Sequence, residues 1–303
     1  MKTNERQATD TLLMIRPSRF GFNAETASSN IFQSIPEEEA AVQTQALKEF
    51  DLLVKKLRGQ KIYIIALQDR GTSRIPDSIF PNNWISFHSG TMILYPMLAE
   101  NRRAERREDW IAFLKQTFGV WEVKNFSSEE LNGNFLEGTG SMVLDRINKI
   151  AYAGFSSRTN PALFQQWCNM MNFEAAFFTA RIADGNEIYH TNVLMSIGER
   201  VAVLCSEVIR DAAERKKILK KLSEHREVIE ITEHQMMHFA GNLLLVKNRE
   251  GRNFWVLSDQ AFNSLSIAQK ELLKQDGDFI CSDLKSIEST GGGSARCMIA
   301  EIF

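Results

Sequence analysis

Three residues of types that suit covalent catalysis recur at a nearly constant interval along this chain. Glu137, His190 and Cys297 occupy corresponding places in similar segments, with Asn82 and Gly241 completing a series whose steps are 55, 53, 51 and 56 residues. A cysteine nucleophile needs a thiolate, a histidine that exchanges its proton and a group that holds the electrophile. If similar structural units surround a common centre, these positions all face it. The series therefore predicts thiol chemistry at that centre.

Each of the three residues also has a structural interpretation when it is taken alone. His190 could cap the end of a strand, Glu137 could anchor the turn at 138–140, and Cys297 follows a glycine triplet that could be a flexible loop. Glycine triplets also allow close approach of the backbone to another group. Convergence on equivalent repeat positions favours the functional interpretation. The sequence places the other cysteines in apolar or alternating runs, which favours the core for Cys168, Cys205 and Cys281.

The segments that carry this series predict a repeated structural unit. Each has an apolar residue, a short polar or glycine-containing stretch and a strand-like apolar run: FPNNWISF, FLEGTGSMVL, IYHTNVLMSI and FAGNLLLVK, with MIRPSRFGFN as a more divergent copy. Amphipathic helices are predicted over 37–57, 102–118 and 210–225, and their charge runs are interpreted as solvated faces. Strands, helix and strand repeated about five times indicate an α/β fold of the five-bladed propeller type. No linker divides the chain, so one domain over 1–303 is expected.

Composition excludes several classes of function. The 303 residues include 36 Lys and Arg against 38 Asp and Glu, a net charge of −2, which disfavours binding to nucleic acid or to an anionic membrane. No apolar stretch reaches the length of a membrane span and MKTNERQATD has no apolar leader, so a cytoplasmic location is expected. No metal site is expected, because the cysteines form no CxxC pair and His234 and His238 lack a third ligand. His88 and His225 are interpreted as surface or structural histidines.

Motifs along nearly the whole chain are similar to those of the guanidine-modifying pentein superfamily. MIRPSRFGFN, PDSIFPNNW, LEGTGSMVLD, YHTN and above all the terminal GGGSARCM carry the resemblance. It implies a five-bladed α/β propeller like those of arginine deiminases, dimethylarginine hydrolases and amidinotransferases. It also implies that Cys297 is the nucleophile, His190 the general acid and base, and Glu137 the carboxylate beside the substrate nitrogen. Asp77 matches an acidic position of the dimethylarginine hydrolase branch.

Two departures from the guanidine-processing pattern concern substrate charge. Asn82 and Asn83 stand where those members carry acidic residues, and Asn192 stands where an Asp usually follows the histidine. A carboxylate grips a guanidinium through charge-assisted bonds, whereas an amide both donates and accepts. The asparagines therefore suit a neutral ureido group, and the chain resembles the branch described as citrulline-utilisation hydrolases. The alternative is that the asparagines are structural and that Glu137 and Asp77 bind a guanidine.

The sequence thus predicts a hydrolase that needs no cofactor and acts on a C–N bond of a ureido or guanidino compound, with citrulline favoured. Arg16 and Arg296 are candidates for a clamp on a substrate carboxylate, with a structural ion pair as the alternative for each. Three other functions stay open: an amidinotransferase, a binding protein on the same fold, and a propeller that binds ribosomal RNA, which the net charge disfavours. Whether the chain forms a homo-oligomer is left open.

Overall fold

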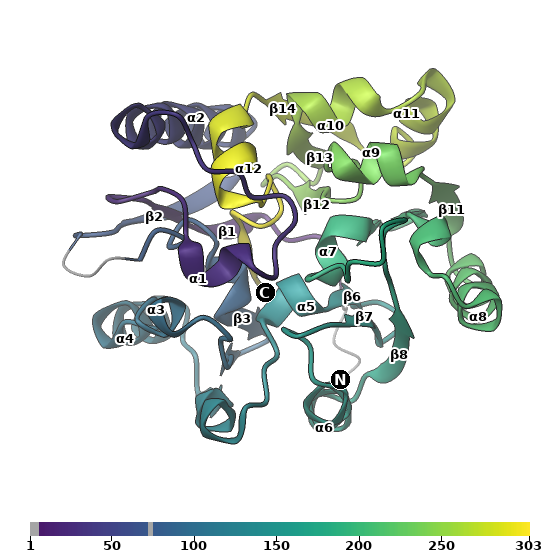
Figure 1. The fold of residues 1–303 in the computed structure, drawn as a ribbon, viewed down its shortest axis with the longest axis horizontal. Coiled ribbons are helices and arrows are strands. Elements are labelled where there is room, and N and C mark those ends of the chain that lie inside the picture. Colours follow the sequence, from purple (N-terminus) through teal and green to yellow (C-terminus); the bar gives the residue numbers. More distant parts are fainter. Residues whose placement is uncertain (1–5, 72–74) are drawn as a thin grey trace.

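The fold consists of five small sheets of one recurring design. A computed structural model describes residues 6–71 and 75–303 of the chain. Within these residues, fifteen strands form five three-stranded sheets. In each sheet the middle strand pairs antiparallel with one neighbour and parallel with the other. Figure 1 shows the sheets distributed around a centre that the short helices α5 and α7 occupy.

The strands of each sheet are short, and the strand that pairs in parallel with the middle strand is the most exposed of the three. The first sheet has β15 (Ala300–Ile302), β1 (Thr11–Arg16) and β2 (Tyr63–Gln68), and the second β3 (Ile85–His88), β4 (Thr91–Leu94) and β5 (Glu122–Asn125). The third has β6 (Val143–Asp145), β7 (Ile150–Phe155) and β8 (Glu174–Thr179), and the fourth β9 (Met195–Ile197), β10 (Val201–Leu204) and β11 (Glu227–Glu230). The fifth has β12 (Leu244–Lys247), β13 (Asn253–Ser258) and β14 (Asp278–Ser282).

The first sheet joins the two ends of the chain. Strand β15 pairs antiparallel with β1, with Thr11 opposite Ile302 and Leu13 opposite Ala300. The pairing supplies the antiparallel neighbour that β1 would otherwise lack. It also ties the segment just before β15, which contains Cys297, to the start of the described chain.

Longer helices connect the middle strand of each sheet to its parallel neighbour. They are α2 (Glu39–Gly59), α4 (Glu108–Thr117), α6 (Pro161–Met171), α8 (Ala212–Ser223) and the pair α10 (Asp259–Ser264) and α11 (Ile267–Leu273). In Figure 1 they lie at the rim. The predicted α/β repeat is confirmed, and the three predicted helices correspond to α2, α4 and α8. The sequence analysis missed α6, which begins where Pro161 occupies the first turn and the Asn160 side chain accepts a hydrogen bond from the Leu163 amide.

Short helices and turns connect these elements, and α5 and α7 lie at the centre (Figure 1). The short helices are α1 (Ala24–Ala27), α3 (Glu100–Arg103), α5 (Gly138–Ser141), α7 (Thr191–Leu194), α9 (Glu233–Met237) and α12 (Lys285–Gly291), with 3₁₀ turns at Pro81–Asn83, Ser127–Asn132 and Ser206–Val208. Glu137 and His190 are the residues that immediately precede α5 and α7. Each repeat therefore begins with a tight turn that faces its counterparts.

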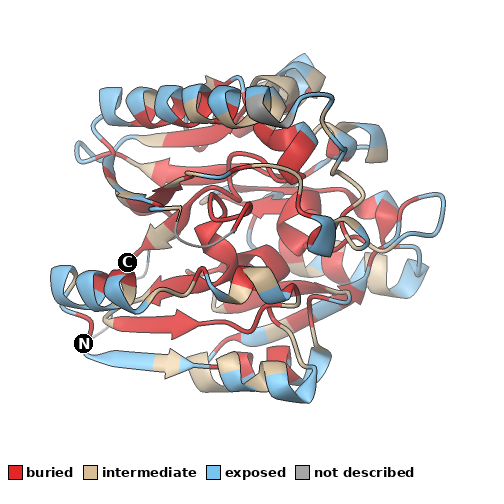
Figure 2. Cartoon of the chain, turned by 60° about the vertical axis from the view of Figure 1, so that its left-hand side comes forward, coloured by how far each residue is buried: buried red, intermediate tan, exposed pale blue. Residues whose placement is uncertain are grey.

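Burial follows the inner parts of the repeats. Figure 2 shows the central turns and inner strands buried, with exposure on the outer faces of the helices and on some outer strands. Cys168 and Cys205 are fully buried, as predicted, and Cys281 is half-buried on β14. In the part of the chain that the structure describes, none of the helices combines the length and apolar character that crossing a membrane requires.

Candidate active site

Cys297 reaches the centre of the molecule through the glycine-rich turn that follows α12. Gly292 adopts a φ of 65°, in the left-handed region that favours glycine. A Cβ on Gly293 would lie 3.0 Å from the Phe80 ring and 3.2 Å from the Cys297 Cβ. The glycines thus let this turn pack directly against Phe80 and hold the thiol in place, which is a structural reason for the triplet.

Two asparagine amides surround the thiol, which is only 3% exposed. Asn242 Nδ2 donates to Cys297 Sγ at 3.2 Å and to the Asn192 carbonyl at 2.8 Å. The side chain of Asn192 lies farther from the sulfur, with Nδ2 at 3.7 Å. Burial raises the pKa of the Cys297 thiol, and the hydrogen bond from Asn242 offsets part of this effect. The thiol is therefore protonated in the resting state and lies beside amide donors that can stabilise negative charge.

His190 and Glu137 form a buried pair. His190 Nε2 donates to Glu137 Oε2 at 2.8 Å, and the other oxygen of Glu137 accepts from the Leu98 amide at 3.0 Å. Arg158 lies 3.5 Å from Glu137 Oε2. Both oxygens of Glu137 are thus engaged with the protein, and the contact with Nε2 leaves Nδ1 of the imidazole to exchange a proton.

The electrostatics of this pair favour a neutral imidazole beside an ionised carboxylate. Burial disfavours the charge on Glu137, but Arg158 and the hydrogen bond from His190 outweigh it and hold the pKa of Glu137 well below its usual range. Burial lowers the pKa of His190 to about 4, because Glu137 compensates only in part and Arg158 also disfavours the cation. At neutral pH, His190 is therefore poised to accept a proton.

A pocket opens over the thiol. Its lining consists of charged, amide and aromatic side chains, the Cys297 thiol and two glycines: Asp77, Phe80, Asn83, Arg102, Arg158, Tyr189, His190, Gly291, Gly293 and Cys297.

The carboxylate of Asp77 has one oxygen in use and one without a partner. Asp77 Oδ2 accepts from Asn23 Nδ2 at 2.7 Å, while Asp77 Oδ1 is buried without a hydrogen-bond partner among the described residues. Burial raises the pKa of Asp77, and the nearby Arg102 charge opposes the rise. Asp77 thus offers one unused acceptor to a ligand.

Asn83 offers the matching donor. Its Oδ1 accepts from Arg102 Nη1 at 2.8 Å, and its Nδ2 is buried without a partner in the described part of the chain. Arg102 is itself fixed by Glu105, which accepts from Nε at 2.8 Å and from Nη2 at 3.0 Å. Because a guanidinium can only donate, Arg102 turns the oxygen of the Asn83 amide toward itself and the NH₂ group away.

Five of the nine residues singled out from the sequence lie outside this pocket lining. Glu137 and Asn192 contact residues of the lining, His190 and Cys297 respectively, whereas Arg16, Arg296 and Asn82 have other surroundings. Arg16 forms an exposed two-point ion pair with Asp51, at 2.7 and 2.8 Å. Arg296 lines a second cavity with Glu301. Asn82 is buried, and its carbonyl would lie 2.3 Å from a Cβ on Gly138, so its backbone packs against the turn that carries Glu137.

The sequence analysis missed Arg102, Arg158 and Asn242. Asn242 directly follows the repeat position of Gly241, so one step beyond the series would have found it. The interpretation of the 102–118 charge run as a solvated face is wrong at its start, because Arg102 is 2% exposed and Glu105 is 0% exposed. These two charges pair with each other inside the molecule, which a local sequence pattern does not reveal.

Histidines outside the pocket have structural surroundings. His234 and His238 pack against each other, with ring centroids 4.5 Å apart, and His238 Nδ1 contacts the His234 carbonyl. His88 lies between Ser86 and Arg146, and His225 is exposed. Across residues 6–71 and 75–303, no group of three or more His, Cys, Asp or Glu side chains is arranged to hold a metal ion.

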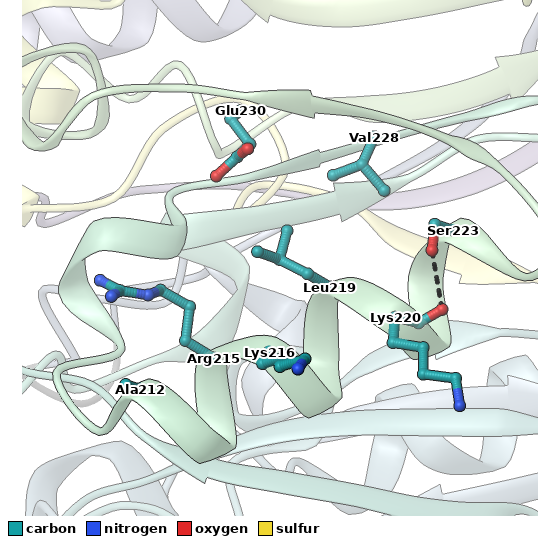
Figure 3. A pocket seen from close by; sticks show the side chains of 8 residues that line it. All are labelled: Ala212, Arg215, Lys216, Leu219, Lys220, Ser223, Val228 and Glu230. Carbon is teal, nitrogen blue, oxygen red and sulfur yellow. Dashed lines mark hydrogen bonds between the residues drawn. The ribbon is translucent and has the colours of Figure 1, made fainter.

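A wider groove lies on the outside of the fourth sheet, between α8 and β11. Figure 3 shows Leu219 of α8 pointing toward Val228 of β11, with Arg215 and Lys216 on the helix and Glu230 on the strand. Ser223 donates to the Lys220 carbonyl at 2.9 Å. The groove contains neither a cysteine nor a histidine, so it lacks the reactive groups of the central pocket.

The sequence matches one family of known proteins over most of its length. Residues 16–303 match the family model described as N,N dimethylarginine dimethylhydrolase, eukaryotic. Among curated protein sequences, no match was found.

Solved structures with similar folds share little sequence. The apo structure of ArgZ, an arginine dihydrolase from the ornithine-ammonia cycle in cyanobacteria, superposes with a TM-score of 0.75 at 16% identity, over 96% of this chain and 40% of that one. Unliganded AgrE gives 0.76 at 16% identity, over 97% and 39%. DDAH from Pseudomonas aeruginosa, as a cysteine-to-serine mutant complexed with citrulline, gives 0.69 at 15% identity, over 97% and 100%. The chain therefore spans about 40% of the length of full-length ArgZ and AgrE.

Proposed function

Since the chain belongs to the eukaryotic N,N dimethylarginine dimethylhydrolase family, within the pentein superfamily, we propose that it is a cysteine-dependent hydrolase of a ureido compound, with citrulline favoured. The five sheets are then the blades of a propeller, and residues 1–303 form one catalytic domain. Cys297 is the nucleophile, His190 the general acid and base, and Glu137 the carboxylate that orients His190. The last role differs from the expectation that Glu137 contacts the substrate nitrogen, because both of its oxygens are already occupied by protein donors.

One observation carries the preference for a ureido group: the pocket presents one unused buried donor and one unused buried acceptor. The donor is Asn83 Nδ2 and the acceptor is Asp77 Oδ1. A ureido group has a carbonyl oxygen that needs a donor and N–H groups that need acceptors. A guanidinium has only N–H donors, so it would leave Asn83 Nδ2 without a partner, which costs about 1–3 kcal/mol for a buried group.

The orientation of Asn83 is fixed by the protein and does not adapt to the ligand. Flipping the amide would place its NH₂ group against Arg102, whose guanidinium is also a donor and is held by Glu105. Arg102 is thus a positioning residue that makes Asn83 a donor. The ion pair is buried, and the Arg102 guanidinium also donates to the Phe80 carbonyl at 3.2 Å, which restricts its movement.

The reaction follows from the resting protonation states. The thiol proton of Cys297 passes to His190 as Sγ bonds to the ureido carbon. The tetrahedral intermediate collapses when the imidazolium returns this proton to the departing nitrogen, which breaks the C–N bond and leaves a carbamoyl thioester on Cys297. Water, deprotonated by His190, then attacks the thioester carbon and releases carbamate and the thiol. Asn242, which donates to Sγ, is placed to stabilise the thiolate that leaves.

A guanidino substrate is the second candidate, and the family match and Asp77 favour it. N-methylated arginine or arginine would use the Asp77 carboxylate for a charge-assisted bond. An amidinotransferase would use the same nucleophile but would require an amine acceptor in place of water. A non-catalytic binding protein would need no reactive thiol.

Turnover of a small substrate panel tests the proposal. Citrulline, arginine, methylated arginines and agmatine are each incubated with the enzyme without added amine, and kcat/KM is measured from release of the amine product. We expect citrulline to give the highest value. A higher value for arginine or a methylated arginine would select the second candidate, and turnover only with an added amine would select a transferase. Failure of a haloacetamidine to label Cys297 would favour the binding protein.

A further inference from the structure

A second cavity contains a buried cation whose guanidinium makes no hydrogen bond with the described residues. It is lined by Gln7, Thr139, Leu144, Ile197, Arg296 and Glu301, among others. Arg296 is 6% exposed. Among residues 6–71 and 75–303, its guanidinium makes no hydrogen bond and no ion pair within 4.0 Å, although the Glu301 charge on the same cavity attracts it. The backbone amide of Arg296 donates to Asn242 Oδ1 at 3.1 Å, which anchors the residue while its side chain enters the cavity.

The other polar groups of this cavity already have partners. Gln7 Nε2 donates to the carbonyls of Leu144 and Ile197, and Gln7 Oε1 accepts from the Arg146 amide. Glu301 Oε2 lies 3.8 Å from the Arg146 guanidinium. An unpaired buried charge is costly, and the five N–H groups of a guanidinium need acceptors. The unmet requirement in this cavity is therefore for an acceptor in direct contact with the Arg296 guanidinium, which Glu301 attracts only from a distance.

We propose that this cavity binds a small monovalent anion of halide size, such as chloride, with the Arg296 guanidinium as its principal ligand. The cavity is small, which excludes a phosphate ester or an amino acid. Glu301, on the same wall, opposes the anion and keeps its affinity moderate. This site depends on neither the substrate nor the reaction assigned to the central pocket.

Occupancy would act on the nucleophile because Arg296 immediately precedes Cys297. The positive charge of Arg296 lowers the pKa of the Cys297 thiol, against the larger effect of burial. An anion beside the guanidinium cancels part of that charge. Halide binding therefore disfavours the thiolate and slows its reaction with electrophiles.

Bromide is the probe for the site, because its anomalous scattering distinguishes it from water. Crystals of the full chain are soaked in sodium bromide, and we expect an anomalous peak within hydrogen-bond distance of the Arg296 guanidinium. In solution, bromide should raise Tm by about 2 °C or more over methanesulfonate at equal ionic strength, and it should slow labelling of Cys297 by chloroacetamidine. A peak absent from this cavity, or equal Tm values in the two salts, would overturn the proposal.

Paired variants separate this site from general salt effects. Arg296→Gln should abolish the rise in Tm, whereas Arg252→Gln, which removes an exposed arginine, should retain it. Glu301→Gln removes the opposing carboxylate and should lower the bromide concentration that gives half of the effect. If Arg296→Gln fails to fold, Glu301→Gln decides: an unchanged or higher half-effect concentration overturns the proposal. None of these readouts requires turnover, so they stand whatever the substrate proves to be.

Discussion

The pocket over Cys297 and the groove beside α8 show how differently one fold can arrange charged side chains. In the pocket, Arg102, Arg158 and Asp77 are at most 2% exposed, and each has a hydrogen-bond partner from another segment of the chain. In the groove, Lys216 and Lys220 are exposed on the surface of one helix (Figure 3). The groove is the wider of the two, yet only the pocket combines a thiol, an imidazole and unused buried hydrogen-bonding atoms.

The difference shows that burial, more than pocket size, determines which side chains have strongly shifted pKa values here. Burial raises the pKa of Cys297 and lowers that of His190 to about 4. It also lets Glu137 and Arg158 act strongly on the pKa of His190. Exposed charges are screened by water and salt and contribute little to specificity. Variants in the two regions should therefore have very different consequences.

Replacing the nucleophile should have the largest effect. Cys297→Ser is expected to reduce turnover to the detection limit, because a serine hydroxyl is a far weaker nucleophile unless a base activates it. Circular dichroism and Tm should stay close to those of the wild type. Cys281→Ser, a half-buried thiol on β14, serves as the matched control and should remain active. Wild-type turnover by Cys297→Ser would reject the covalent mechanism.

Loss of the imidazole should have the next largest effect. His190→Ala removes the group that exchanges protons with the thiol and the leaving nitrogen, so kcat should fall by about two to four orders of magnitude. His225→Ala, on an exposed histidine, should leave kcat unchanged. A decrease of less than tenfold for His190→Ala would assign the residue a structural role.

The sequence was sufficient to find the residues of these two predictions, because they recur at a regular interval. The same interval predicted the repeated α/β unit, since each copy has its own apolar run and turn. The interval identifies the turn but does not show which residue of the turn faces the pocket. Asn82 and Asn83 are adjacent, yet only Asn83 lines the pocket.

The remaining residues depend on contacts that local patterns do not encode. Arg102, Arg103, Arg106 and Arg107 form one basic run, yet only Arg102 lines the pocket, where it meets Asn83 from a separate segment. Arg158 lies over the Tyr189 ring at 4.8 Å, another contact between distant segments.

The role proposed for Glu137 also required the structure, since its partners Leu98 and His190 come from different repeats.

The raised pKa of Cys297 predicts the pH dependence of its reactivity. At pH values below the pKa of a thiol, the thiolate fraction increases about tenfold per pH unit. When the pKa is raised, this increase continues to a higher pH than it does for a free cysteine. Labelling of Cys297 by chloroacetamidine, followed by peptide mass spectrometry, should therefore be slow at pH 7 and still increase above pH 9. A plateau below pH 8 would mean that the resting enzyme holds a thiolate.

Substrate preference should change by a smaller factor. Asn83→Asp with Asn192→Asp replaces two amides by carboxylates, which attract a guanidinium and repel a ureido oxygen. A charge-assisted bond exceeds a neutral one by about 1 kcal/mol, so each exchange should shift the ratio of kcat/KM for citrulline to that for arginine about fivefold toward arginine. The ratio is the relevant quantity because absolute activity also reflects misplacement. Asn82→Asp, outside the pocket lining, is the control, and an equal shift in that variant would contradict the role of Asn83.

The smallest effect is expected in the groove beside α8. Lys216→Ala removes an exposed cation from a helix surface, and surface substitutions of this kind usually change the free energy of unfolding by less than about 0.5 kcal/mol. Lys216 lies outside the set of residues that lines the central pocket, so kcat, KM and the citrulline-to-arginine ratio should all stay within about twofold of the wild type. Lys220→Ala should behave in the same way. A larger change in KM for either variant would show that the groove communicates with the pocket, and the contrast between the two regions would then have to be abandoned.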